Sequence, residues 1–286
     1  MPPARSEAAQ TNSLRRSIPK TGEALPAVGL GTWQVFDVAG NAVELAQARE
    51  TLRRFVELGG ALVDSSPMYG TSEAVVGDLT AALGVRQRLF IATKVWTTGR
   101  AAGVRQMEES MAKLRVDRLD LMQVHNLVDA DMHLATLRDW KRAGRIRYLG
   151  VTHYTSSAYR ELEPYVASGD LDFVQLNYSL GERAAEARLL QLAADTRTAV
   201  LVNRPFMEGA LFRRTRGKPL PDWAKEIDCE SWAQFFLKWI IAHPAVTCAI
   251  PGTRNPQHVA DNLGAAQGKI PDEPTRRKMA DYFDRL

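Results

Sequence analysis

The chain has 286 residues, of which 45% are hydrophobic and 24% are charged, and its net charge is +4. This composition is ordinary for a soluble globular protein, and so mild a charge does not favour a nucleic-acid ligand. No apolar run approaches the roughly 18–20 residues that cross a bilayer, and the two cysteines are too few for a disulfide framework. We therefore expect a cytoplasmic protein that binds neither membrane nor nucleic acid.

The predicted elements begin after a polar stretch. Residues 1–17 are expected to form a flexible tail, and residues 18–286 one folded domain. Eight short apolar runs in that domain have the length and composition of strands. They are AVGL (27–30), ALVD (61–64), LFIATK (89–94), LDLMQVH (119–125), IRYLGV (146–151), FVQLN (173–177), TAVLVN (198–203) and VTCAI (246–250).

Amphipathic stretches separate these runs and predict helices. In residues 44–59, for example, the apolar side chains recur at the helical period and Gly59-Gly60 ends the pattern. Thr71-Ser72 is expected to cap the second helix, and Asn255-Pro256 to start the last helix of the repeat. The expected helices cover 44–59, 73–83, 103–115, 131–143, 156–167, 182–194, 230–242, a stretch from 255 onward, and 273–285.

Strands that alternate with helices imply parallel βαβ units, and eight such units imply an α/β fold of the (β/α)8 TIM-barrel type. An open doubly wound sheet is the alternative. It ranks lower because the first strand continues as GLGTWQVF, without the GxGxxG pattern. Residues 206–229 form a long connection, and the final helix at 273–285 is expected to pack outside the barrel.

Ionisable side chains stand at the ends of three successive predicted strands. Asp64, Lys94 and His125 end the second, third and fourth strands, and successive members are about 30 residues apart, the length of one βα unit. Barrel active sites lie at the carboxyl ends of the strands, so these side chains are expected to meet there. Tyr69, in the loop after Asp64, can lean over them.

This set predicts a proton donor. A nearby ammonium stabilises a phenolate, so Lys94 is expected to lower the pKa of Tyr69 while Asp64 holds the ammonium in place. His125 can bind the phenol or the incoming oxygen. Reduction of a carbonyl needs such a donor, because the oxygen gains negative charge as hydride reaches the carbon.

In these stretches the sequence resembles the aldo-keto reductase family. The likeness runs from about residue 18 to 266 and includes GLGTW (29–33), Asp64 followed by SSPMYG (65–70), ATKVW (92–96), DLMQVHN (120–126), LGVTHY (149–154), FVQLNYSL (173–180) and IPGTRNPQHVADNL (250–263). The resemblance implies that Tyr69 is the general acid, with Asp64, Lys94 and His125 as its catalytic partners. It implies no metal.

The resemblance also implies a nicotinamide cofactor across the barrel mouth. Its contacts are expected at Thr32, Asp64, Gln175, which matches the carboxamide-binding position, and at Thr152 and His153, where the family has a Ser-Asn pair. After the seventh strand the family has an aromatic that stacks on the nicotinamide, whereas this chain has Asn203 and Arg204, which are expected to bind the cofactor there, the arginine by stacking or by contacting phosphate. Phe206 is expected to shape the pocket, and the basic stretch 213–218 is either a strap over the pyrophosphate or a solvated loop.

After the eighth strand, Thr253 and Arg254 precede a predicted helix N-terminus, which attracts anions. The family holds the adenosine 2′-phosphate there, and Asn262 matches an adenine contact. The family often has Lys and Arg where this chain has Gly252 and His258, so the expectation of NADPH over NADH rests mainly on Arg254.

The sequence predicts an NADPH-dependent reductase of small-molecule aldehydes or ketones, with a pocket lined by Trp33, Tyr69, Trp96 and Asn126. Two alternatives stay open. One is an NADP(H)-binding sensor of the same fold with little turnover. The other is a phosphate-binding barrel lyase that uses Lys94 as a Schiff base, which the Asp64 and Tyr69 context disfavours. Oligomeric state and the physiological substrate are not readable from the sequence.

Overall fold

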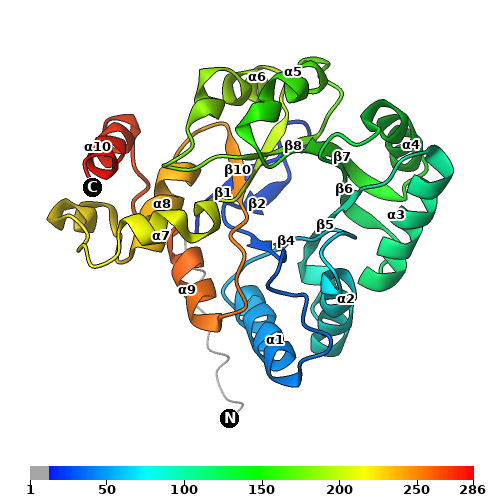
Figure 1. The fold of residues 1–286 in the computed structure, drawn as a ribbon, viewed down its shortest axis with the longest axis horizontal. Coiled ribbons are helices and arrows are strands. Elements are labelled where there is room, and N and C mark those ends of the chain that lie inside the picture. Colours follow the sequence, from blue (N-terminus) through cyan, green and yellow to red (C-terminus); the bar gives the residue numbers. More distant parts are fainter. Residues whose placement is uncertain (1–12) are drawn as a thin grey trace, which may run out of the picture.

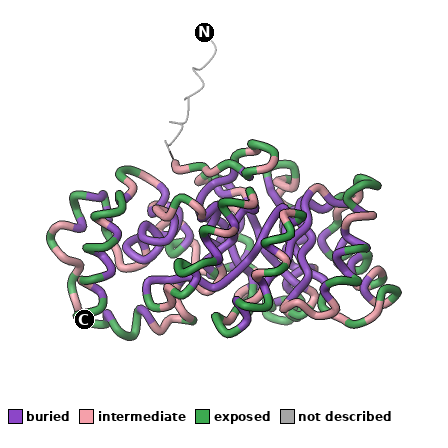
Figure 2. Tube along the Cα trace, turned by 90° about the horizontal axis from the view of Figure 1, so that it is seen from above, coloured by how far each residue is buried: buried purple, intermediate pink, exposed green. Residues whose placement is uncertain are grey.

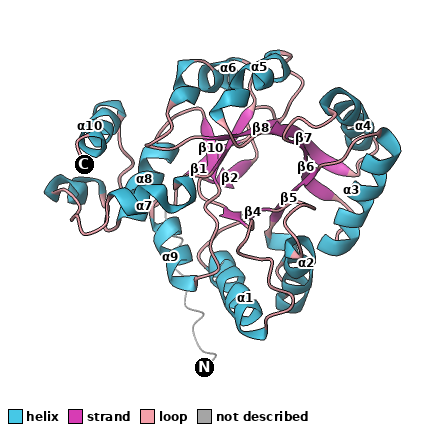
Figure 3. Cartoon of the chain, in the orientation of Figure 1, coloured by secondary structure: helices cyan, strands magenta, loops and turns pink. Residues whose placement is uncertain are grey.

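The structure, a computed structural model, describes residues 13–286. Within this range, eight parallel strands follow one another around a barrel in chain order (Figure 3). The strands are β3 (Leu30–Gly31), β4 (Leu62–Asp64), β5 (Phe90–Val95), β6 (Leu119–His125), β7 (Ile146–Thr152), β8 (Phe173–Asn177), β9 (Ala199–Asn203) and β10 (Val246–Ala249). The predicted (β/α)8 fold is confirmed.

The first and last strands close the barrel through single bridges rather than a long ladder. Val28 pairs with Ala249, and Gly31 pairs with Gly252, both in parallel. The first strand is therefore shorter than the predicted run 27–30, whereas the other seven begin and end within one residue of their predicted limits.

A short antiparallel hairpin covers the amino-terminal end of the barrel. It consists of β1 (Arg15–Ser17) and β2 (Ala24–Pro26). Ile18 and Leu25 of this hairpin are buried in the cluster that fills the barrel interior. The folded domain therefore begins before residue 18, and the expected tail was drawn too long, while its residues 1–12 lie outside the described range.

Helices surround the barrel and bury their apolar faces against the strands (Figures 1 and 2). In α1, for example, Leu52, Phe55 and Val56 are buried. The helices around the strands are α1 (Ala42–Glu57), α2 (Ser72–Leu83), α3 (Arg100–Leu114), α4 (Ala130–Arg142), α5 (Tyr159–Ala167), α6 (Leu189–Asp195), α8 (Trp232–Ile241) and α9 (Pro256–Gly264). None of the helices described is both long and apolar enough to cross a membrane.

The caps of two helices differ from each other. Asn255 caps α9 as predicted, because its side chain accepts a hydrogen bond from the Gln257 N–H. Thr71 stands at the start of α2 but makes no side-chain cap bond. Its hydroxyl and its N–H both donate to Asp37, at 2.8 Å, so the prediction of a cap was wrong. Thr71 instead ties the loop that follows β4 to the loop that follows β3.

The connection 206–229 is more ordered than a bare loop. It contains α7 (Ala210–Arg214) and two short 3-10 turns, Met207–Gly209 and Asp222–Ile227. The final helix, α10 (Glu273–Asp284), lies outside the ring of barrel helices, as expected (Figure 1). Arg214 donates to the Asp284 carbonyl and Lys218 to that of Leu286. Two of the basic residues of 213–218 therefore hold the end of the chain, which argues against the strap over a pyrophosphate.

Candidate active site

The three predicted strand ends meet at one height in the barrel wall. Asp64 pairs in register with Ala92, two residues before Lys94, and Lys94 pairs with Gln123, two residues before His125. Side chains two apart on a strand point to the same face. Asp64, Lys94 and His125 therefore all turn into the carboxyl end of the barrel, as the spacing predicted.

Lys94 and Asp64 form a buried ion pair. The Lys94 Nζ lies 2.6 Å from Asp64 Oδ2, and the two side chains are 0% and 3% exposed. Lys94 also donates to the Ser65 carbonyl at 2.6 Å. Burial alone lowers the pKa of Lys94, but Asp64 and Tyr69 together raise it above its ordinary value. Lys94 is therefore held as an ammonium.

The second oxygen of Asp64 is also saturated. Its Oδ1 accepts from Gln175 Nε2 at 3.0 Å and from Gln123 Nε2 at 3.2 Å. A buried charge needs such partners, since an unpaired one is strongly destabilising. Gln123 was missed in the sequence. Its signal is a polar residue inside the apolar run LDLMQVH, two positions before His125 and hence on the same face of β6.

Tyr69 lies over this pair. The Lys94 Nζ is 4.8 Å from the centre of the phenol ring, and the ring centres of Tyr69 and His125 are 5.9 Å apart with their planes at 85°. Burial raises the pKa of Tyr69, and Lys94 opposes that shift without cancelling it. The expectation of a lowered pKa was therefore wrong for the protein alone: the phenol is kept protonated, beside a cation that would stabilise its anion.

His125 is held by Ser66, a residue that was not predicted to belong to the site. Its Nδ1 lies 3.0 Å from Ser66 Oγ, in the Ser-Ser-Pro turn that leads to Tyr69. Burial, with Lys94 and His153 nearby, lowers the pKa of His125 to about 2. The ring is therefore neutral at physiological pH. Among residues 13–286, its Nε2 has no hydrogen-bond partner, and this nitrogen is left for a ligand.

A buried carboxylate fixes the catalytic loop from behind. Glu73, in the first turn of α2, accepts from Thr93 Oγ1 at 2.5 Å and from Ser110 Oγ at 3.1 Å. Burial raises the pKa of Glu73. Thr93 neighbours Lys94 on β5, and Glu73 follows Tyr69 by four residues, so this contact fixes the phenol loop relative to the lysine. This contact could not be predicted from the sequence, because a glutamate in a first helical turn usually faces solvent.

The expected nicotinamide contacts lie on the adjacent strand ends. Thr152 donates to Gln175 Oε1 at 3.1 Å, and Gln175 is bonded through both atoms of its amide. Asn203 Nδ2 donates to the His153 carbonyl at 3.1 Å. Asn203 Oδ1, in contrast, is buried with no partner among the described residues. Thr32 is buried too, and its hydroxyl donates to the Asp64 carbonyl at 3.0 Å.

Several other residues that were expected to contact the substrate or the cofactor surround the barrel mouth. Trp33 and Trp96 are each 42% exposed, and the Trp96 ring centre lies 6.4 Å from that of His125. Asn126 follows His125 with a left-handed backbone, φ 52°, and its buried Oδ1 lacks a partner in the described chain. Arg204 donates to the Tyr154 carbonyl at 3.0 Å. The two tryptophans are therefore partly open to solvent, and Asn126 offers an unpaired acceptor.

Phe206 belongs to a different group. Its ring centre lies 4.8 Å from that of Phe212 and 6.4 Å from that of Phe236, so it packs on α7 and α8. His153 stacks on Tyr154, with ring centres 5.4 Å apart. No three His, Cys, Asp or Glu side chains of the described chain cluster closely enough to hold a metal ion.

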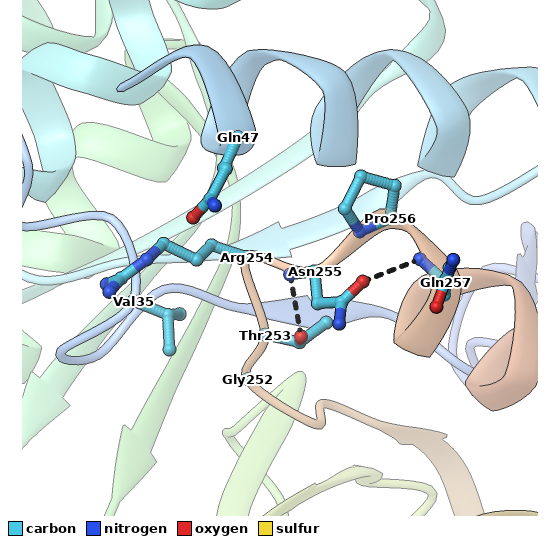
Figure 4. A pocket seen from close by; sticks show the side chains of 8 residues that line it. All are labelled: Val35, Gln47, Gly252, Thr253, Arg254, Asn255, Pro256 and Gln257. Carbon is cyan, nitrogen blue, oxygen red and sulfur yellow. Dashed lines mark hydrogen bonds between the residues drawn. The ribbon is translucent and has the colours of Figure 1, made fainter. Parts of the chain in front are cut away.

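A cavity of about 710 Å³ lies between α1 and the loop that joins β10 to α9 (Figure 4). The lining residues are Val35, Gln47, Gly252, Thr253, Arg254, Asn255, Pro256 and Gln257. Thr253 Oγ1 accepts from the Asn255 N–H at 3.0 Å. Arg254 is ion-paired with Glu44 of α1. Asn262 is buried further along α9. The cavity thus combines a cation with a helix N-terminus, the two features that the sequence predicted there.

Known proteins are similar to this chain in sequence and in fold. Residues 27–277 match the model of the aldo/keto reductase family. Methylglyoxal reductase YeaE of Escherichia coli is 30% identical over 254 residues, which cover 86% of this chain and 87% of that protein. NADH-specific methylglyoxal reductase, also from Escherichia coli, is 26% identical over an aligned length of 318 positions, which covers 91% of this chain and 96% of that protein. A Klebsiella pneumoniae aldo-keto reductase solved in complex with NADPH has a TM-score of 0.79 at 25% identity, covering 94% and 95%. The chain belongs to the aldo/keto reductase family.

Proposed function

We propose that this chain reduces aldehyde or ketone carbonyls to alcohols by hydride transfer from NADPH, with Tyr69 as the general acid. One observation carries the proposal: the Tyr69 phenol lies against the buried Lys94–Asp64 pair and edge-on to His125. This arrangement suits an oxygen that must receive a proton as it becomes negative.

The residues divide the proton transfer among them. Tyr69 gives its hydroxyl proton to the carbonyl oxygen, and the Lys94 ammonium stabilises the phenolate that remains. Asp64 keeps Lys94 charged and fixed, because the pair is buried and Lys94 also donates to the Ser65 carbonyl. His125, neutral and anchored through Ser66, offers Nε2 to the same oxygen. Solvent then returns a proton to Tyr69.

The residues present fit a nicotinamide cofactor. When bound, that cofactor would supply the hydride. The unpaired, buried Asn203 Oδ1 is an acceptor suited to the N–H groups of a primary carboxamide. At the other end, Thr253, Arg254 and the N-terminus of α9 are suited to phosphate. Gln175 acts more indirectly in this arrangement, since its amide orients Asp64 and accepts from Thr152.

The relatives support a small carbonyl substrate. Two relatives from Escherichia coli are named methylglyoxal reductases, so methylglyoxal is the first substrate to test. The exposed parts of Trp33 and Trp96 favour an apolar group beside the reacting carbonyl. Schiff-base chemistry at Lys94 is disfavoured, because a buried ammonium paired with Asp64 is a poor nucleophile.

The test is consumption of NADPH by the purified protein with methylglyoxal and a panel of larger aldehydes and ketones. We expect carbonyl-dependent oxidation of NADPH, with alcohol as the product. Tight binding of NADPH without turnover of any carbonyl would contradict a reductase and favour the cofactor-binding sensor. Glyceraldehyde, which is polar, and 4-nitrobenzaldehyde, which is apolar, would show whether the two exposed tryptophans select for apolar substrates.

A further inference from the structure

Arg254, the cation expected to bind the 2′-phosphate, is already paired with a carboxylate of the protein. Arg254 pairs with Glu44, and the two side chains are 31% and 32% exposed. Glu44 lies in the first turn of α1, where Asn41 accepts a hydrogen bond from its N–H at 3.1 Å. The pair therefore joins the start of α1 to the loop before α9, across the cavity between them.

Glu44 lies beside the cavity and on its side of α1. Gln47 follows Glu44 by three residues and lines the cavity. Residues three apart on a helix are neighbours on one face, so Glu44 and Gln47 point the same way. In Figure 4, Gln47 projects from α1 toward the extended side chain of Arg254. A ligand that reaches Arg254 therefore meets the Glu44 carboxylate as well.

A carboxylate and a guanidinium at this place favour different ligands. In Rossmann folds, which bind the same cofactors, an acidic residue accepts a hydrogen bond from the ribose 2′-hydroxyl of NAD, whereas an arginine accommodates the 2′-phosphate of NADP. Here the two are bonded to each other. A hydroxyl can be accepted with the pair intact, but a phosphate must displace Glu44 from Arg254 and lie close to a second negative charge.

We propose that Glu44 sets the cofactor preference of this enzyme. Paired with Arg254, it accepts the 2′-hydroxyl of NADH, and it must release Arg254 before the 2′-phosphate of NADPH can bind. The inference rests on the proposed function, because it assumes that the adenosine end of the cofactor occupies this cavity. It predicts that the wild-type protein binds both cofactors and that the advantage of NADPH is small.

A purely structural role for the pair is the competing explanation. Pairs this exposed contribute little to folding, because water screens them and both side chains lose freedom. Asn41 already caps α1 through its own side chain, and Asn255 caps α9. The two helix starts thus have capping bonds that do not involve the Arg254–Glu44 pair, so its removal is expected to leave the fold intact.

The experiment compares binding of NADPH and NADH by wild type and Glu44→Gln, using fluorescence titration at low salt. Removal of one charge next to a phosphate should tighten NADPH by about tenfold, the effect of one charge-assisted contact, and leave NADH unchanged or weaker. Glu50→Gln is the matched control. It removes the same charge from the same helix, but Glu50 pairs with Arg53 of that helix, whereas Glu44 pairs with Arg254 at the cavity.

Adenosine 2′,5′-bisphosphate and ADP serve as a second pair of probes, because they lack the nicotinamide. Glu44→Gln should tighten the first and not the second. Equal changes for both, or no change, would overturn the role of Glu44. Failure of wild type to bind either dinucleotide would instead refute the proposed function, and the inference with it. Binding of both cofactors without carbonyl turnover would refute only the reductase, and the ratio of affinities would still test Glu44.

Discussion

The two ends of the candidate site are built in opposite ways. At the barrel mouth, Lys94 and Asp64 are almost completely buried and every oxygen of the carboxylate has a partner. At the cavity beside α9, Arg254 and Glu44 are each about a third exposed and can separate. The first arrangement is rigid because a buried charge cannot lose its partner, whereas the second can exchange a carboxylate for a phosphate.

This difference orders the effects expected from substitutions. Substitution of the buried charges at the mouth should abolish turnover and lower the free energy of unfolding. Salt should hardly alter the size of these effects, because the charges are shielded from solvent. Changes at the cavity should alter only the choice of cofactor, and salt should weaken them.

The largest effect is expected for Lys94→Met. It leaves the Asp64 carboxylate buried and unpaired, so the free energy of unfolding should fall by about 3–5 kcal/mol, and turnover should be lost. Chemical denaturation and steady-state kinetics measure the two. The double variant Lys94→Met with Asp64→Asn should regain much of the stability but none of the activity. Full activity in either variant would show that the ammonium is not needed.

A smaller effect concerns His125 and stability at low pH. Its pKa in the folded protein is about 2, against about 6.5 when unfolded, so below pH 6.5 only the unfolded state takes up the proton. The stabilisation that the neutral His125 side chain gives the folded protein is complete above about pH 6.5. Below that pH the free energy of unfolding falls by about 1.4 kcal/mol per pH unit. Unfolding free energies of wild type and His125→Gln should therefore converge as the pH is lowered from 7 toward about 5.

The control for that measurement is His258→Gln, since His258 is an exposed residue of α9. This variant should keep the slope of the wild type. Parallel curves for wild type and His125→Gln across the same range would mean that His125 takes up a proton in the folded state, contrary to its burial.

The smallest effect is expected for Arg254→Ala. Loss of one partly exposed cation should weaken NADPH by about tenfold and leave NADH almost unchanged, and the difference should shrink at high salt. Fluorescence titration with both cofactors at two salt concentrations decides it. Arg277→Ala, on α10, is the control. Equal weakening of both cofactors would place Arg254 on the pyrophosphate or in the fold instead.

The periodic features of this protein were readable from its sequence. Seven of the eight strands lie within a residue of their predicted limits, because buried parallel strands are short apolar runs with polar ends. The same regularity brought Asp64, Lys94 and His125 together, since one βα unit separates each from the next. The N-terminal hairpin was missed, because its polar residues 15–17 are an edge strand held by only one partner.

What the sequence could not predict are contacts between elements with no fixed spacing. Glu44 and Arg254 are 210 positions apart, and neither residue marks the other. Glu73 looks like an ordinary first-turn acid until α3 covers it with Ser110. The predicted direction of the Tyr69 pKa shift was wrong for a similar reason. The nearby lysine was evident from the sequence, but the burial of the phenol, which outweighs the lysine, depends on the assembled barrel.

The central claim is that Tyr69 gives the proton, and Tyr69→Phe tests it most directly, because the ring is kept and only the hydroxyl is removed. Turnover of methylglyoxal, or of the best carbonyl found, should fall by about 10²–10⁴-fold, which is the usual contribution of a general acid. The affinity for NADPH should be unchanged, since Tyr69 is not among the expected cofactor contacts. Turnover close to that of the wild type in this variant would contradict the account.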